Sequence, residues 1–542
     1  MKTDPITAEV VARYLLMAAE EMGATLTRTA FSPNIKERAD CSSAVFDAHG
    51  NVIAQAHRVP IHLGSMIGTV ATLLKRFPES EIRPGDMFVA NDPYNGGGTH
   101  LPDINVVAPV FRHGRIVAFV ANIAHHADVG GMVPGSEAAV CKTIFQEGLR
   151  LPLVRVMRAG EINRDVVDII LLNSRTPEER IGDLRAQFAA NFVGIQRVAA
   201  LFEKYTDAGA AAAIAGFLDF TERRFAAAIS RLPAGVYEDV DYLDGDAPGE
   251  TVPIRTVLTI GDGTLHFDFS GSARQLASSR NIPRQALLAT IYTVAKSLLD
   301  PDLPANAGYY RTITATTEPG SVIDPMLPAA VGTRSITCGV LGDLIAAVLS
   351  QAQPDKALAR SGPHHLMVLC GTDPRSGRYF VNYETVAGGM GARARRDGMD
   401  AVRVHASGAA NLPTEALEHA FPFLVETYAL RPDSGGAGRY RGGLGVVRDY
   451  RVLADDVTVS LSSERQAVAA TGLAGGAAGA TGCFILNPDT PDAQILPSAA
   501  AEVPLPRGSI LRVCTPGGGG FGALSERDAA AVVRDKREGR CT

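Results

Sequence analysis

The sequence predicts an α+β fold of several domains, in which glycine-rich mixed sheets accompany helical segments. Three observations lead to this prediction. The chain has 542 residues, more than one hydrophobic core normally organises, which indicates two to four domains. Helical and strand patterns follow one another in runs rather than in strict β–α–β alternation. The 55 glycines gather in short runs, which is typical of a protein rich in loops and turns.

The N-terminal part begins with predicted helices and short strands. Thr7 is the expected N-cap of a helix whose apolar residues recur at helical spacing until Gly23 interrupts them. The segment 41–55 predicts a hairpin. A second helix is expected over 64–77, and a strand over 85–90 follows it.

The rest of the chain first becomes helical and then rich in strands. Residues 176–233 are alanine-rich and predict helices, and the following segments alternate in strand fashion around a turn at 261–263. Two more helices are expected near 286–300 and 339–351. The last third is strand-rich, with glycine runs and no fixed-period repeat, and a short helix is expected in 525–540.

The composition argues against two classes of function. Charged residues make up 20% of the chain and the formal net charge is −6, so neither nucleic acid nor an anionic membrane is an expected partner. The N-terminus lacks the apolar core of a secretory signal, and no uncharged apolar stretch approaches the length of about 18 residues that a membrane span needs. The seven cysteines form no CxxC pair, which favours reduced thiols and a cytoplasmic protein.

The stretch "NDPYNGGGTHLPDINVVAPVF" at 91–111 opens a predicted hairpin with its turn at 112–115. In an antiparallel pair the numbers of opposite residues have a constant sum, so the loop length decides the register. A two-residue loop puts Asp103 opposite Ala124, whereas a three-residue loop puts it opposite His125. Residues directly opposite one another have Cβ atoms about 5 Å apart.

His100, Asp103 and His125 are therefore expected to converge at one end of this hairpin. Two imidazoles and a carboxylate are a common set of ligands for a catalytic divalent metal such as Zn, Mn, Fe or Co. Asp40, at the start of an apolar strand, is a candidate fourth ligand. His126 has the opposite strand parity and is expected behind the ligands or in another pocket. The alternative interpretation is a chance HxxD pattern with hydrogen-bonded structural histidines.

The sequence predicts four regions along the chain, and the first of them contains this site. They are an N-terminal metal-site region at 1–175, a helical segment at 176–235, a central α/β region at 236–430 and a C-terminal glycine-rich β region at 431–542.

Several motifs together resemble the hydantoinase B/oxoprolinase family. They are "NDPYNGGGTHLPD", "HHADVGG", "QEGLRLP", "GDLRAQFAAN", "YETVAGGMGAR", "SGGAGRYRGGLG" and "TPGGGGFG". The matching segments run from about residue 5 to 525 in the family's order, so the resemblance covers nearly the whole chain.

The resemblance implies the B-type subunit of an ATP-dependent hydrolase of cyclic amides such as hydantoins, lactams or oxoproline. An A-type, actin-like ATPase subunit phosphorylates the amide oxygen, and a metal-bound water in the B-type subunit then opens the ring. The family's metal ligands map onto Asp40, His100, Asp103 and His125. A heterotetramer of two A-type and two B-type subunits is implied. The sequence itself contains no GxxxxGK[ST] phosphate-binding loop.

Six further polar residues in these motifs are candidates for the site. His126, Asp128 and Glu147 are candidate catalytic groups, and Asp128 is expected to hold His125 or His126 in one tautomer. Asn91, Asn122 and Glu384 are candidate substrate contacts. Turn formation, capping or ion pairs are the alternative interpretations.

Other polar features of the motifs also have two interpretations. Arg334 and Arg393 are candidates to hold a carboxylate or phosphate, and surface ion pairs are the alternative. His405 is a candidate acid or base. The segment "TPGGGGFG" is expected to form a tight turn, with phosphate binding through its backbone N–H groups as the alternative.

Two other functions remain open from the sequence. One is a subunit of an ATP-dependent ketone carboxylase of the acetophenone type, which would use the same metal site and the same type of partner. The other is a non-catalytic scaffold subunit whose metal is structural. The segments "GTRSITCGV", "SERQAVAATGLAGG" and "NAGYYRTI" look divergent from the family's usual forms, so the ring that the enzyme opens is not fixed by the resemblance.

Overall fold

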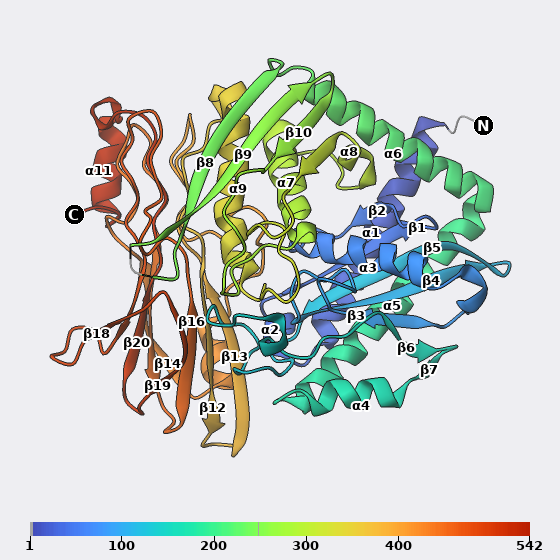
Figure 1. Ribbon diagram of the computed structural model, residues 1–542, viewed down its shortest axis with the longest axis horizontal. Helices are drawn as coiled ribbons and strands as arrows, with labels where there is room; N and C mark the ends of the chain where they lie inside the picture. The colour runs from blue at the N-terminus through green and yellow to red at the C-terminus, as the bar shows by residue number, and fades with distance from the viewer. Residues whose placement is uncertain (1–3, 248) are drawn as a thin grey trace.

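The computed structural model describes residues 4–247 and 249–542, and its N-terminal part is built on a seven-stranded sheet (Figure 1). The strand order is β2-β1-β5-β4-β3-β6-β7, and every neighbouring pair is antiparallel. The strands are β1 (Cys41–Asp47), β2 (Val52–Gln55), β3 (Met87–Ala90), β4 (Asp103–Arg112), β5 (Arg115–His125), β6 (Val154–Arg158) and β7 (Glu161–Ile162). The central strands are buried on both faces, so both faces of the sheet need a cover.

Helices supply that cover on each side of the sheet. α1 (Pro5–Thr29) and α5 (Pro177–Tyr205) pack on one face, and α3 (His62–Arg76) packs on the other. Alternate residues of a strand point to opposite faces, so Val106 and Val120 join the core under α1 and α5, whereas Phe119 and Ile123 join the core under α3. The sheet therefore separates two hydrophobic cores.

The first helix differs from its prediction at two points. It begins at Pro5 with Asp4 as its N-cap, because the Asp4 carboxylate accepts a hydrogen bond from the backbone N–H of Thr7. Thr7 thus lies inside the first turn and is not the cap. The helix also continues through Gly23, where a Cβ atom would lie 3.2 Å from the Ser43 hydroxyl, so this glycine allows close packing of α1 on β1.

A second α/β layer follows beyond α3. α7 (Arg284–Leu299) packs on α3, and α9 (Arg334–Ala352) packs between α7 and the strands β8 and β9. These strands belong to a four-stranded sheet of order β11-β10-β9-β8, with β8 (Gly235–Asp244), β9 (Thr251–Gly261), β10 (Thr264–Asp268) and β11 (Ile313–Thr316). Figure 1 shows α9 between the blue-to-green half of the molecule and the orange and red strands.

Helix α9 is apolar on all sides because it is surrounded on all sides. By length and composition it is the one helix among the described residues that would suffice to cross a membrane. However, 89% of its apolar window is buried inside the structure, as in the core helix of a folded domain.

The C-terminal part contains two antiparallel sheets that share one hydrophobic core. One sheet has the order β13-β12-β16-β19 and the other β14-β15-β20-β17-β18. The strands are β12 (His365–Asp373), β13 (Arg378–Val386), β14 (Phe423–Leu430), β15 (Val446–Val452), β16 (Val457–Ser462), β17 (Cys483–Leu486), β18 (Gln494–Leu496), β19 (Ala499–Leu505) and β20 (Ile510–Cys514). The first of these sheets lies against the site described below.

Glycine-rich segments beside these sheets form a separate unit, which we call the glycine bundle. It consists of residues 359–362, 388–392, 434–445, 470–480 and 515–522, which hydrogen-bond to one another through their backbones. The N–H groups of Gly517, Gly518, Gly519 and Gly520 donate to Ala480, Gly443, Arg360 and Ala477 respectively. The prediction of a tight turn for this segment is wrong, and these N–H groups are already occupied, so the segment is not a phosphate loop either.

The remaining predicted elements agree with the structure, and the α+β, multi-domain class is confirmed. The other helices are α2 (Pro33–Lys36), α4 (Arg164–Leu172), α6 (Asp207–Ile229), α8 (Ala307–Tyr310), α10 (Thr414–Ala420) and α11 (Ala529–Arg537). Four of them, α2, α4, α8 and α10, have no counterpart among the predicted elements. Strands pair across the expected boundary at 430/431, because β12 pairs with β16 and β14 pairs with β15. We therefore propose that 360–542 forms one C-terminal region.

Candidate metal centre and its pocket

The hairpin of β4 and β5 brings its two open ends together in the register that the metal site needs. The turn has two residues, His113 and Gly114, both with positive φ, as tight hairpin turns require. A bulge then leaves Val117 without a partner on β4 and shifts the pairing by one residue. As a result Asp103 lies directly opposite His125. The turn thus has the two-residue length, but the bulge gives the register expected for a three-residue loop.

His100, Asp103 and His125 form a buried cluster at this end of the hairpin. One potential ligand atom from each residue lies within 4.8 Å of the others. The Nε2 atom of His100 is 3.1 Å from Oδ1 of Asp103. The other ring nitrogen of His100, Nδ1, lies 2.6 Å from Oε1 of Glu137 and 2.9 Å from the carbonyl oxygen of Gly332. A proton on Nδ1 therefore has two acceptors, and Nε2 faces Asp103.

These donors fit a divalent cation. Nε2 of His100 and Oδ1 of Asp103 are both buried, and neither makes a hydrogen bond with well-formed geometry. Burial alone would lower the pKa of His100, as would Arg334, but Asp103 and Glu137 outweigh both and raise it to about 9. Burial likewise opposes ionisation of Glu137, yet His100 holds its pKa at about 2. His100 is therefore protonated at neutral pH in the absence of a metal. A metal ion that binds its Nε2 atom would replace a proton.

Asp40 and His62 stand beside this cluster. Nε2 of His62 lies 3.5 Å from Oδ1 of Asp40 and 3.6 Å from Oδ1 of Asp103. Its Nδ1 atom is 3.1 Å from the hydroxyl of Ser42. Asp40 is therefore close to the predicted position, but His62 lies between it and Asp103. Burial lowers the pKa of His62 although both carboxylates oppose this.

Each histidine of the cluster is held by neighbouring side chains. Asn34 lies 3.0 Å from Nδ1 of His125 and also donates to its backbone carbonyl oxygen. The ring of Tyr383 stacks on the His125 ring, with centroids 4.2 Å apart. Arg334 donates from Nη2 to the second carboxylate oxygen of Asp103, at 2.5 Å. These contacts hold His125 and Asp103 in their positions within the cluster.

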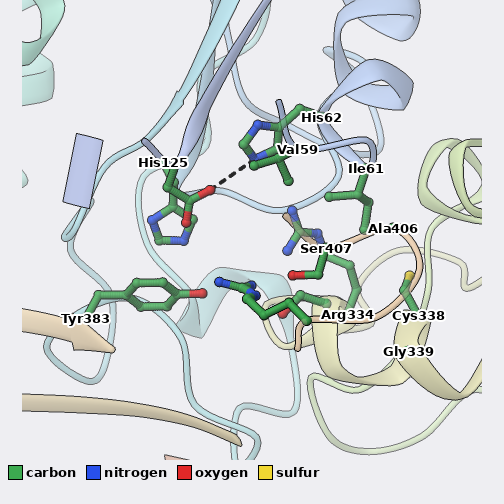
Figure 2. Close-up of a pocket in the computed structure, with 13 residues that line it drawn as sticks. Val59, Ile61, His62, His125, Arg334, Cys338, Gly339, Tyr383, Ala406 and Ser407 are labelled. Carbon is green, nitrogen blue, oxygen red and sulfur yellow. Dashed lines mark ion pairs between the residues drawn. The ribbon is translucent and has the colours of Figure 1, made fainter. Parts of the chain in front are cut away.

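A small pocket with a cavity volume of about 20 Å³ opens beside the cluster. Its wall combines residues of the first sheet, α9 and the C-terminal region, and it includes Asp40, His62, His125, Arg334, Tyr383 and Arg403. Figure 2 shows His62, His125, Tyr383 and Arg334 around a common space, with the ion pair of His62 drawn as a dashed line. A cavity of this volume holds about one water molecule.

Four residues around the cluster are absent from the predicted set: His62, Glu137, Tyr383 and Arg403. Two of them left a signal in the sequence. His62 is the only ionisable residue in the stretch 59–74, and Glu137 is the only charged residue in 129–141. An ionisable side chain in an apolar stretch is expected to be buried together with a partner. His62 and Glu137 are both buried, and each has such a partner. No comparable signal marks Tyr383 or Arg403.

Three predicted residues are buried away from the pocket. The amide of Asn91 makes three hydrogen bonds to the backbone of Leu101, Leu149 and Leu151, so it ties loops together. Asn122 and His126 lie on the opposite face of β5 from His125 and contact Gln187 of α5. None of these three residues lines the pocket, and the opposite strand parity expected for His126 is observed.

Within the part of the chain that the structure describes, Asp128 makes no hydrogen bond to His125 or His126. Its carboxylate accepts from the backbone N–H groups of Gly130, Gly135 and Arg175, and it pairs with the Arg175 guanidinium at 2.9 Å. It therefore organises the loop that follows β5. The expected tautomer-holding role belongs by geometry to Glu137 for His100.

Glu147 is connected to the cluster through one residue, Gly332. Its Oε1 atom accepts hydrogen bonds from the N–H groups of Val331 and Gly332, at 2.9 and 2.6 Å. The carbonyl oxygen of the same Gly332 faces His100. Burial raises the pKa of Glu147 to about 8, although these N–H groups and His100 oppose the shift. Glu147 thus positions the segment that contacts a metal-site histidine.

Glu384 points away from the pocket because its neighbour Tyr383 points into it. Its carboxylate faces Arg448 at 3.5 Å on the other side of β13, and burial raises its pKa. The prediction for Glu384 identified a strand that lines the pocket, but the residue that faces the pocket is its neighbour Tyr383. Of the two predicted anion-binding arginines, Arg334 lines the pocket, whereas Arg393 donates to the backbone of Asp397. His405 pairs with Asp343 at 2.8 Å.

Fold and site together define a multi-domain α+β protein with a buried His–Asp cluster beside a small polar pocket. The chain belongs to the hydantoinase B/oxoprolinase family, whose model matches residues 4–524. This confirms the resemblance that the motifs indicate.

Proteins of known sequence resemble this chain over almost its whole length. An uncharacterized protein of Methanocaldococcus jannaschii is 37% identical over 99% of this chain and 93% of its own length. A putative D-/L-hydantoinase B-type subunit of Pseudomonas sp. is 30% identical over 100% of this chain and 94% of its own length. The 5-oxoprolinase 1 of Arabidopsis thaliana is 31% identical over 96% of this chain, which spans only 42% of that longer protein.

Two solved structures share the fold. The crystal structure of ATP-dependent caprolactamase from Pseudomonas jessenii superposes with a TM-score of 0.92 at 27% identity, covering 100% of this chain and 95% of that chain. The nucleotide-free structure of acetone carboxylase gives a TM-score of 0.91 at 20% identity, over 99% of this chain and 78% of that chain. At that identity the second likeness concerns the fold alone.

Proposed function

We propose that this chain is the B-type subunit of an ATP-dependent hydrolase of cyclic amides, and that ring opening takes place at the His100–Asp103–His125 cluster. The observation that carries this proposal is a buried cluster of potential ligand atoms from His100, Asp103 and His125, all within 4.8 Å of one another, beside a pocket in a chain of this family. The hydantoinase and caprolactamase relatives support a cyclic amide as the substrate.

The proposed metal ligands are Asp40, His100, Asp103 and His125, with His62 next to Asp40. A divalent transition ion bound there lowers the pKa of a water molecule and polarises an electrophile. The surrounding residues keep the donors in place. Glu137 accepts the Nδ1 proton of His100, and Arg334 occupies the second oxygen of Asp103.

A partner that uses ATP is part of the proposal. An unstrained cyclic amide is a poor electrophile, and phosphorylation of its oxygen provides a leaving group. The B-type designation of the hydantoinase relative and the ATP dependence of the caprolactamase support an A-type ATPase partner for this chain. We propose an assembly of two A-type and two B-type subunits in the cytoplasm, where the seven free cysteines stay reduced.

The test is coupled hydrolysis by the full-length chain co-purified with an A-type subunit. Hydantoin, 5-oxoproline and caprolactam are offered with ATP, and ring-opened product and phosphate are measured. We expect product only when ATP and both subunits are present. Turnover by this chain alone without ATP would contradict the proposal that a separate A-type subunit activates the substrate.

Three further outcomes would redirect the proposal. ATP consumption that requires a ketone and bicarbonate would assign the chain to a carboxylase. A firmly bound metal with no reaction on any cyclic amide or ketone would favour the scaffold function. Full activity of the His100→Ala variant would remove the cluster from the reaction.

A further inference from the structure

Arg403 lines the pocket and has unused hydrogen-bonding capacity. Both of its hydrogen bonds come from Nη1, one to the Thr385 hydroxyl at 2.6 Å and one to the carbonyl oxygen of Ala409 at 3.4 Å. Among residues 4–247 and 249–542, its buried Nε atom has no hydrogen-bond partner, and its Nη2 atom donates to none of them either. A guanidinium has five N–H donors in a fixed fork, so the Nη2 donors are available to a ligand.

A second arginine stands beside it without relieving its charge. Arg38 is fully buried and donates to Asn34, to the carbonyl oxygens of Tyr383 and Ala410, and to the same Thr385 hydroxyl. All of these acceptors are neutral. Among the residues that the structure describes, no carboxylate oxygen lies within 4.0 Å of either guanidinium. Two like charges therefore share one neutral acceptor.

This arrangement is costly in the absence of an anion. Arg38 is fully buried, whereas Arg403 is partly buried. Buried charges in proteins are normally paired, so the Arg38 cation without a counter-charge destabilises the fold. Burial, together with Arg38, lowers the pKa of Arg403 to about 10, so it stays charged at neutral pH. By contrast Arg334, on the same pocket wall, is paired with Asp103.

Tyr383 completes the polar side of the pocket. Its ring is fixed between the His125 ring and the Arg38 guanidinium, which lies 5.1 Å from the ring centroid. Figure 2 shows the Tyr383 hydroxyl directed into the pocket. A phenol held in this way offers a further hydrogen-bond donor next to Arg403.

We propose that Arg403, assisted by the Tyr383 hydroxyl, is a binding site for an oxyanion group of the substrate, next to the His–Asp cluster. That this oxyanion belongs to the substrate rests on the proposed function; the existence of the oxyanion site does not. Guanidinium groups bind phosphoryl and carboxylate groups through two parallel hydrogen bonds.

Two sources of this oxyanion have the same chemistry. One is the phosphoryl group that activates the amide oxygen, which every substrate of the proposed reaction would carry. The other is a carboxylate on the ring, which oxoproline-like substrates carry and unsubstituted lactams lack. The two are separated by the preference of the site for phosphate or for acetate.

The test measures binding of inorganic phosphate and of acetate to the metal-loaded full-length chain by calorimetry at constant ionic strength. We expect Arg403→Gln to weaken binding of the preferred anion at least tenfold while elemental analysis shows unchanged metal content. Arg403→Lys keeps the charge and loses the fork, so an intermediate affinity is expected. Preference for phosphate assigns the site to the activating phosphoryl group, and preference for acetate assigns it to a ring carboxylate.

Arg395→Gln is the matched control. This arginine lies in the same region, its side chain is 76% exposed, and its one carboxylate neighbour is 3.8 Å away. Equal anion affinity in wild type, Arg403→Gln and Arg403→Lys would overturn the proposal, as would binding of neither anion by the wild type. Since no turnover is measured, failure of the proposed hydrolase function appears separately, as absent ATP-dependent ring opening with the anion site intact.

Discussion

Two neighbouring histidines at the end of β5 lie on opposite faces of the sheet. His125 faces the cluster, whereas the ring of His126 faces Gln187 on the other side of the sheet. We expect His125→Ala to weaken binding of a divalent transition metal more than about 100-fold, because it removes a ligand and even supporting residues contribute 10–100-fold. His126→Ala is expected to leave metal affinity within about threefold of wild type, given ordinary scatter. Metal content and affinity are measured by elemental analysis and chelator competition.

The pair is informative because the two variants remove the same side chain one residue apart. Loss of metal in both variants, with unfolding in neither, would contradict the separation of the two faces. Loss in neither variant would place the metal elsewhere.

Glu147 acts through the backbone that it holds. Because burial raises its pKa to about 8, the carboxyl keeps a proton in the folded state between about pH 4.5 and 8, where the unfolded chain has released it. The unfolded state then binds fewer protons, so stability falls as the pH rises through this range. We expect Glu147→Gln, which mimics the protonated group, to remove this part of the pH dependence. Unfolding temperatures from pH 5 to 8.5 check it.

The alanine variant at this position tests the positioning role. Glu147→Ala leaves the N–H groups of Val331 and Gly332 without their acceptor, which costs about 1–3 kcal/mol. Coupled ring opening is expected to survive Glu147→Gln and to weaken in Glu147→Ala. Complete loss of activity in a stable Glu147→Gln variant would instead support the predicted acid–base role.

At the scale of single residues, the sequence indicates the kind of side chain but not always the face on which it lies. His100, Asp103 and His125 were found because Pro102 and the hairpin limit their positions. Glu384 is the predicted functional residue of its segment, whereas the structure places its neighbour Tyr383 in the pocket. Strand parity alone decides between them, and it follows from pairing with β12.

At the scale of elements, the register of the metal hairpin depends on the unpaired residue Val117. A loop-length argument from sequence has to choose between two registers, since a bulge leaves no clear mark in an apolar strand. Helices were easier to predict, because apolar periodicity is local. The buried helix α9 was also found, since its apolar length is itself the signal.

The glycine bundle has no counterpart among the predicted elements, because its order comes from contacts between segments far apart in the chain. Extended glycine segments carry no side-chain period and form hydrogen bonds with several other segments. What the sequence does show is the glycine content itself. The structure supplies the reason, which is that most of these positions have no room for a Cβ atom.

Gly518 makes this close packing testable. A Cβ atom there would lie 2.2 Å from the carbonyl oxygen of Met390, a backbone atom that hydrogen bonds hold in place. We expect Gly518→Ala to lower the free energy of unfolding by about 3 kcal/mol or more. Gly216, inside α6, has open space around its Cα, so Gly216→Ala is expected to stabilise by up to about 1 kcal/mol. Denaturant midpoints of both variants are compared, and equal shifts would contradict the packing argument.

At the scale of the whole molecule, the site is assembled from three parts of the chain. The metal cluster comes from the first sheet, Arg334 comes from α9, and Tyr383 and Arg403 come from the C-terminal region. No sequence pattern links residue 40 to residue 403, because their proximity depends on how the layers pack. The sequence therefore predicts His100, Asp103 and His125, which one hairpin brings together, and Arg334, but misses Tyr383 and Arg403 on the opposite wall of the pocket.

A buried ionic network joins the layers that carry these walls. Arg465, after β16, pairs with Asp241 of β8 at 2.8 Å and lies 3.7 Å from Asp343 of α9, with only 1% of its side chain exposed. Arg465→Met leaves both carboxylates short of a partner, so we expect a loss of about 3 kcal/mol in unfolding free energy. Arg378 pairs at 2.9 Å with Glu178, also across the molecule, but both side chains are more than 70% exposed. Because water screens such a pair, Arg378→Met is expected to leave the denaturant midpoint unchanged, and a comparable shift in both variants would show that burial is not what makes the network stabilising.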